Sequence, residues 1–116
     1  MTRDEAIRKI RESASLGSAT PIFENDREVE LARLTADLVA SAIEPASAVI
    51  LGVAYSEAGL EELLARDAPL VIARSEDNWL GYLPVAQEFF LAYGPDPSHL
   101  NALGFHSADA LAEWRG

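Results

Sequence analysis

The chain of 116 residues has the length of a single domain with one hydrophobic core. Nineteen acidic and nine basic residues give a formal charge of −10, and cysteine is absent, which excludes a disulfide framework or a cysteine metal site. An acidic chain is a poor ligand for nucleic acid or an anionic membrane, because both are bound through Lys and Arg. No apolar run approaches the roughly 18 residues that span a bilayer. The charged first residues lack the apolar segment of a secretory signal, so a soluble, cytoplasmic protein is expected.

Two helices are predicted at the beginning of the chain. A capping box of Thr2 and Glu5, followed by apolar residues at helical spacing, predicts a helix over residues 3–14. Residues 15–20 are predicted to form a loop. Asn25 with Glu28 predicts the start of a second helix that ends before residue 45. Its expected apolar stripe consists of Val29, Ala32, Ala36, Val39 and Ile43, and it is widened by Leu31, Leu34 and Leu38.

The middle of the chain predicts a strand, a helix and a strand. Residues 47–55 and 69–74 are β-branched apolar runs that suggest strands buried on both faces. Residues 56–67 between them are amphipathic, with leucines on one face and glutamates opposite. If the two strands are parallel, their connection should cross over in the right-handed sense. Residues 79–83 are predicted to return as a third strand, antiparallel to the second.

Residues 85–93 allow two interpretations. The favoured one is a helix that begins after Pro84 and stops at Gly94, because apolar side chains recur there at helical spacing. The alternative is a fourth strand, since aromatic residues are good strand formers. In that case a turn lies near Gln87 and Glu88, and one face carries Phe89, Leu91 and Tyr93.

Two short helices are predicted at the end of the chain. The first covers residues 97–103, and the second covers residues 108–114 with Ser107 as its N-cap. Leu111 and Trp114 are expected to face inward. The predicted fold is therefore a single small domain over residues 1–116, of the α+β or mixed α/β class.

Weak signals for catalysis have simpler explanations. Ser56 follows a predicted strand as the serine of a nucleophile elbow does, but the flanking glycines of that motif are replaced by alanines. A helix N-cap is the better interpretation of Ser56. Glu57, Glu61 and Glu62 are expected to form the solvated face of the following helix. No catalytic residue is predicted.

Two histidines and two carboxylates lie close together in the sequence near the end of the chain. They are Asp96, His99, His106 and Asp109. Imidazole and carboxylate groups can hold zinc, and histidine can act as a general base, but this spacing matches no metal signature. The sequence also has no glycine-rich phosphate loop. Neither a metal nor a cofactor is predicted.

The last third of the chain combines aromatic and acidic residues. Residues 75–114 contain no lysine or arginine, and residues 78–94 hold five of the nine aromatic residues. Phe89 or Phe90 is expected in the core, together with Leu80 or Leu83. The side chains expected to be exposed and to contact a partner or ligand are Trp79 and Tyr82, with Glu76, Asp77, Asp96, His99 and His106 around them.

Three functions are compatible with these features. The favoured one is a non-catalytic acidic module of the immunity-protein, antitoxin or inhibitor type that binds a basic protein. The alternative is a small-molecule binding protein or minor enzyme with a pocket near Trp79, Tyr82, His99 and His106. A third is a homodimer that buries the aromatic residues in a symmetric interface. The acidity can also be only compositional, serving solubility.

Overall fold

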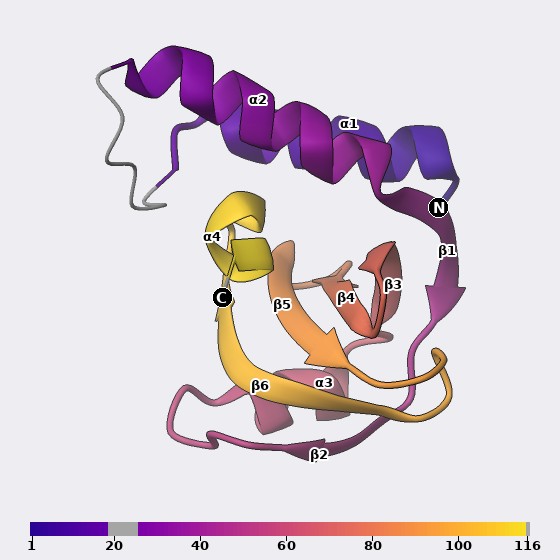
Figure 1. Ribbon diagram of the computed structural model, residues 1–116. Coiled ribbons are helices and arrows are strands. Elements are labelled where there is room, and N and C mark those ends of the chain that lie inside the picture. Colours follow the sequence, from indigo (N-terminus) through magenta and orange to yellow (C-terminus); the bar gives the residue numbers. More distant parts are fainter. Residues whose placement is uncertain (19–25, 116) are drawn as a thin grey trace.

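Two antiparallel helices lie along one side of a curved sheet, and a third, short helix lies on the opposite side (Figure 1). The computed structural model describes residues 1–18 and 26–115, which form one α+β domain of the predicted class. The helices are α1 (Arg3–Ser15), α2 (Arg27–Ala40), α3 (Leu60–Arg66) and α4 (Ala110–Arg115). The strands are β1 (Ala42–Ser47), β2 (Ile50–Val53), β3 (Leu70–Ser75), β4 (Asn78–Leu83), β5 (Glu88–Tyr93) and β6 (Leu100–Ser107).

Helix α1 forms as its capping box predicts. The Thr2 hydroxyl accepts a hydrogen bond from the Glu5 amide, and the Glu5 carboxylate accepts one from the Thr2 amide. The helix buries Ala6 and Ile10 against the sheet and continues one residue beyond the predicted end. Of the loop predicted after it, residues 19–20 lie outside the described residues.

Helix α2 begins at Arg27, and its N-cap is Asp26, whose carboxylate accepts from the Val29 amide. The predicted cap, Asn25, lies outside the described residues. The predicted apolar stripe is confirmed in part: Leu34 and Leu38 are buried, and Leu31 and Val39 pack against the core. The remaining members are not on that face of the helix, because Val29, Ala32 and Ala36 are exposed and Ile43 belongs to β1. Leucine side chains bury more apolar area than alanines, so the row of leucines faces the sheet.

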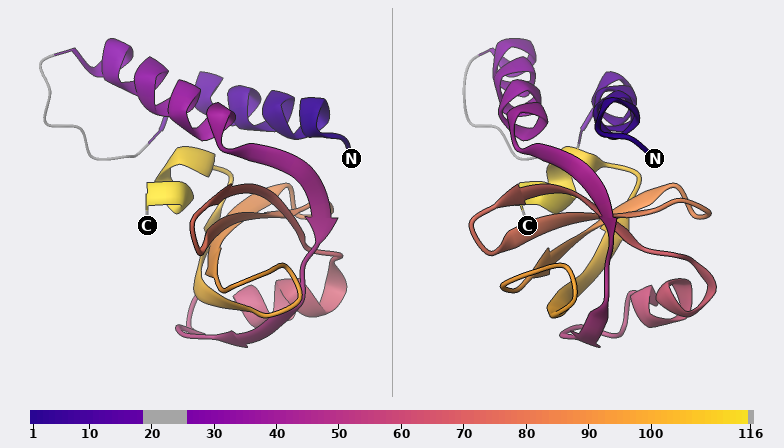
Figure 2. Two further views of the ribbon diagram at one scale, coloured as in Figure 1. Left: turned by 45° about the vertical axis from the view of Figure 1, so that its right-hand side comes forward. Right: turned by 90° about the vertical axis from the view of Figure 1, so that its right-hand side faces the viewer.

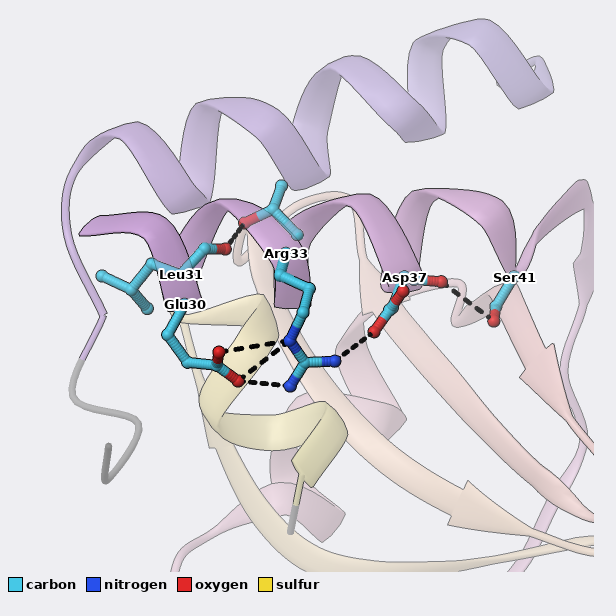
Figure 3. Close-up of polar contacts among 6 residues, drawn as sticks. Glu30, Leu31, Arg33, Asp37 and Ser41 are labelled. Atoms are coloured by element: carbon cyan, nitrogen blue, oxygen red, sulfur yellow. Dashed lines mark hydrogen bonds and ion pairs between the residues drawn. The ribbon is translucent and has the colours of Figure 1, made fainter. Parts of the chain in front are cut away.

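The outer face of α2 neutralises much of its own charge. Arg33 lies one turn from Glu30 on one side and from Asp37 on the other, and its guanidinium binds both carboxylates (Figure 3). Such exposed pairs add little stability. Helix α2 carries three carboxylates and two arginines, so its own net charge is small.

The sheet has the strand order β1-β3-β4-β5-β6-β2, and every pair is antiparallel except β2 with β6. Its two edge strands are consecutive in the chain, joined only by Ala48 and Val49. The Ala48 amide donates to Pro69 and the Val49 amide donates to Pro97. The sheet therefore curls into the ring of strands visible in Figure 2, although β1 and β2 are not paired neighbours in it.

The predicted strand–helix–strand unit forms as β2, α3 and β3, but its two strands are not neighbours in the sheet, because β2 pairs with β6. β2 is also shorter than predicted and lies at an edge, where Leu51 is 63% exposed. The helix between the strands forms, but it begins at Leu60 behind Gly59, which adopts φ +80, so Ser56 is not its N-cap. The antiparallel pairing of β3 with β4 is confirmed.

Residues 85–93 contain a strand, so the favoured helix is wrong and the alternative strand is confirmed. Pro84 belongs to a turn that returns the chain as β5, with Tyr82 opposite Phe89. The helix predicted over residues 97–103 is also wrong, because β6 occupies residues 100–107. In β5 the error arises because both faces are buried, with Phe89 in one core cluster and Phe90 in the other, so helical and strand periodicity are hard to distinguish. In β6 alternate residues are buried, and Gly104 allows the close approach of the Tyr55 backbone instead of ending a helix.

The core lies on both faces of the sheet. One cluster fills the space under α1, α2 and α4 and includes Leu80, Tyr82 and Phe89. The other lies inside the curl under α3 and includes Trp79, Leu83 and Phe90. The predicted core residues are confirmed, as is the inward-facing Leu111 of α4. Trp79 and Tyr82 are each only 2% exposed, so the prediction that they are exposed is wrong.

Candidate functional site

The two aromatic residues predicted to meet a partner are instead held inside the fold. The Trp79 indole N–H donates to the Gly94 carbonyl at 2.9 Å, and the Arg74 guanidinium lies 4.4 Å from the centre of the ring. Tyr82 packs against Phe89 with ring centres 5.1 Å apart. Both are parts of the core and are closed to a partner.

The two acidic residues predicted beside them lie on the surface. Glu76 and Asp77 form the exposed turn between β3 and β4, where Glu76 adopts φ +56. The carbonyl of Asp77 accepts from the Gly94 amide, and that of Glu76 accepts from the Arg74 side chain. Their carboxylates contribute charge to this end of the sheet.

The two histidines lie at opposite ends of β6. His99 precedes the strand and contacts Asp96, with 3.0 Å between Nδ1 and Oδ1. The hydrogen bond from His99 is the main reason that the pKa of Asp96 is lowered. His106 is seven residues further along, roughly 20 Å away at the rise of an extended strand. The predicted pocket of Trp79, Tyr82, His99 and His106 is thus not assembled, and the described residues contain no metal-binding cluster.

The hydrogen bonds of the His106 ring link β6 to two other segments of the chain. Its Nδ1 lies 3.1 Å from a carboxylate oxygen of Glu88, and its Nε2 lies 2.6 Å from the carbonyl oxygen of Ala58. Both partners are acceptors, so only the protonated ring can donate to both. Burial lowers the pKa of His106, but the bonds to Ala58 and Glu88 and the charges of Glu88 and Glu113 outweigh it and raise the pKa.

Next to His106, two exposed aromatic rings stack on each other. Tyr55 and Phe105 are 51% and 52% exposed, and their ring centres are 5.6 Å apart. The Tyr55 amide donates to Leu103, which extends the pairing of β2 with β6. Gly104 adopts φ +124, and a Cβ atom there would lie 2.0 Å from the Tyr55 carbonyl oxygen. A glycine is therefore needed for this close approach.

Two further exposed apolar side chains come from β2 and the residue before it. The described residues include nine large apolar side chains that are exposed, and four of them come from β2, its flanking residues and β6. They are Val49, Leu51, Tyr55 and Phe105, and we call them the β2–β6 surface. Because they come from one pair of neighbouring strands, these exposed apolar side chains are candidates for an interaction site.

An open groove borders this surface. It lies between β2 and α3, has a volume of about 460 Å³, and is lined by Ile50, Leu51, Gly52, Val53, Glu61, Leu64 and Ala65. A smaller hollow of about 140 Å³, between α1 and the β4–β5 hairpin, is lined by Lys9, Glu12 and Tyr82 among others. Only the first hollow is continuous with the β2–β6 surface, because the two share Leu51.

The negative charge is concentrated on the sheet and α3. Residues 42–114 contain eleven acidic side chains and two basic ones, Arg66 and Arg74. Residues 1–41 contain eight acidic and six basic side chains, several of which pair with one another on α1 and α2. The β2–β6 surface therefore lies in the strongly acidic part of the molecule.

The β2–β6 surface was not predicted from the sequence. Tyr55 and Phe105 are far apart in the sequence and lie in segments predicted as a buried strand and a connection between helices. The one available signal was the pair Gly104 and Phe105, since glycine in a strand often marks a close approach of another backbone. This signal could be interpreted only with the structure, which places β6 beside β2.

Comparison of the sequence and structure with protein-family models, curated proteins and solved structures finds no match. Among the described residues, no helix is both long and apolar enough to cross a bilayer.

Proposed function

We propose that the protein is a non-catalytic, acidic protein-binding module that acts in the cytoplasm and recognises a basic partner, in the manner of an immunity protein, antitoxin or inhibitor. The observation that carries the proposal is the separation of charge. Eleven carboxylates against two basic side chains occupy residues 42–114, the same part of the molecule that exposes the apolar β2–β6 surface.

This combination suits protein recognition. A field of one sign accelerates the encounter with an oppositely charged partner and rejects partners of like charge. Exposed aromatic side chains supply the apolar area that fixes the complex once it has formed. Tyr55 and Phe105 provide that area within the acidic field.

The same charge argues against a homodimer as the functional state. A second copy would bring an identical field, so two sheet surfaces would repel each other at the ionic strength of the cell. Sedimentation of the purified protein should therefore give a monomer. A stable dimer would instead support the homodimer as the function of the exposed aromatic residues.

The proposal is tested by affinity capture of a partner from extracts of the source organism at low and high salt. We expect a basic protein to be retained at about 0.05 M NaCl and lost at about 0.5 M, because salt screens exposed charges. One variant neutralises carboxylates near the sheet: Glu57→Gln, Glu76→Gln and Asp77→Asn. The control neutralises three on the helices: Asp4→Asn, Glu12→Gln and Glu28→Gln.

The first variant should weaken capture more than the control, although both lose three charges. Equal effects would mean that only net charge matters, which would remove the basis for a specific acidic site. Capture that is unaffected by salt, or failure to retain any basic protein, would contradict the proposed function.

A further inference from the structure

We infer that the free edge of β2 is the binding site for the partner, which adds an extended, basic segment to the sheet as a further strand. The inference rests on the proposed function and specifies where and how the partner binds.

The first support is that β2 is an open edge. It is the last strand of the sheet, and β6 is its one strand neighbour in the part of the chain that the structure describes. An edge strand presents unpaired backbone amides and carbonyls, on which another strand can form. The groove between β2 and α3 keeps space open along residues 50–53.

The second support is a contrast between the two edges. β1 contains Glu44 and Pro45, a charge and a residue without an amide hydrogen, which are two common protections against unwanted strand pairing. β2 has the sequence Ile-Leu-Gly-Val, with neither a charge nor a proline. One edge is thus blocked and the other is left able to pair.

The third support concerns the chemistry of the occupant. Residues 42–65 contain four glutamates and no basic side chain, and the nearest basic residue, Arg66, ends α3. Glu57, Glu61 and Glu62 are all exposed, and Glu61 lines the groove itself. Lysine or arginine in the added strand would meet these carboxylates, whereas a second copy of β2 would bring the same carboxylates and no compensating charge.

The fourth support is the alternation of side chains in an extended segment. Successive residues of a strand point to opposite sides, so a bound segment can direct apolar side chains to one side and basic ones to the other. The β2–β6 surface offers Leu51 and Tyr55 for the apolar side chains. Helix α3 offers Glu61 for the basic ones.

The test is an NMR titration of the isotopically labelled protein with a short synthetic peptide in which lysine and valine alternate. We expect the amide signals of residues 49–55 and 61–65 to shift at peptide concentrations up to about 1 mM. Two matched peptides serve as controls. One replaces every lysine with glutamate, and the other carries N-methyl groups on alternate amides along one edge, which removes the backbone donors facing β2.

Both control peptides should bind at least roughly tenfold more weakly than the first. Glu61→Lys should have a similar effect, whereas Glu28→Lys on α2 reverses another exposed charge, away from the groove, and should leave binding unchanged. Thermal unfolding of each variant verifies that it is folded. Shifts confined to residues 49–55 and 61–65 would support the inference.

Three results would overturn it: no shift at the highest peptide concentration, shifts spread over other acidic regions with no effect of N-methylation, or the same signals shifting with protein concentration alone. The last would assign the edge to a second copy. If salt-sensitive capture of a basic partner persists alongside any of these results, the proposed function stands and only the β2 edge is wrong. If capture fails while the peptide binds, the proposed function is wrong and the edge is a strand-binding site of another kind.

Discussion

The ring of Phe90 lies across the backbone of Gly81 on the neighbouring strand, and a Cβ atom at residue 81 would be 2.2 Å from the Cζ atom of that ring. Phe90 is fully buried, and protein cores are close-packed, so moving the ring to admit a methyl group is costly. Gly81→Ala should therefore lower the free energy of unfolding by roughly 1–3 kcal/mol. Urea denaturation measures this change. In the double variant Gly81→Ala with Phe90→Leu, the two effects should be less than additive; additivity would show that the ring does not restrict residue 81.

Two substitutions distinguish the buried aromatic residues from the exposed ones. Trp79→Ala should lower the free energy of unfolding by roughly 3–5 kcal/mol, because it empties a filled part of the core. Phe105→Ala should cost about 1 kcal/mol or less, since half of its ring is already in water. Urea denaturation of both variants provides the comparison. Similar losses would contradict the assignment of Trp79 to the core and of Phe105 to the surface.

The third prediction concerns the close approach of Gly104 to Tyr55. Gly104→Ala should displace the Tyr55 backbone and separate the stacked rings, because the added methyl group would overlap the Tyr55 carbonyl at a backbone angle that suits glycine. We expect the nuclear Overhauser contacts between the rings of Tyr55 and Phe105 to weaken or vanish. Ala102→Gly, two residues earlier in β6, adds no atoms and should preserve them. Unchanged ring contacts in the Gly104 variant would contradict this account.

The fourth prediction is a pH dependence that arises from His106. Its pKa in the folded protein is raised above the ordinary value of 6.5, so the protonated ring stabilises the fold fully below that value. This stabilisation is lost as the pH rises through the folded pKa. The groups that face the ring are the carboxylates of Glu88 and Glu113 and the carbonyl of Ala58. The link to residue 58 should accordingly loosen as the pH rises through the folded pKa of His106.

Histidine ring signals followed by NMR against pH, with urea denaturation at each pH, check this prediction. His106→Gln should abolish the stability change in the range above pH 6.5, because glutamine cannot titrate. His99→Gln, which removes the exposed histidine, should preserve it. A folded pKa of His106 at or below 6.5 would show that burial outweighs its partners.

The sequence alone was sufficient to predict those helices and strands whose signals are local. The capping box of Thr2 and Glu5 identified α1, and the turn after β3 identified the hairpin with β4. The sequence was insufficient to predict β5. Pro84 and Gly94 can border a strand as readily as a helix, and Phe89 and Phe90 are buried on opposite faces of the sheet. A polar neighbourhood in the sequence also says little about burial. Trp79 follows three polar residues yet lies in the core.

The candidate site depended most on information that the sequence does not contain. Whether a short apolar run becomes a buried strand or an edge is decided by which strands lie beside it, and that is a property of the whole sheet. Leu51 was therefore predicted in a buried strand although it is exposed at an edge. The unequal distribution of charge along the chain is visible in the sequence, and it is the main argument for the proposed function.

The parallel pairing of β2 with β6 also affects how the protein is made. Ile50 lies opposite Leu100, so a ribosome must add fifty residues after the first strand of this pair before its partner exists. At about 5–20 residues per second, the nascent chain carries an unpaired apolar strand for roughly 3–10 s. Closing so long a segment is also intrinsically slow. An interaction of β2 with another chain can thus begin during synthesis, before the protein has completed its own sheet.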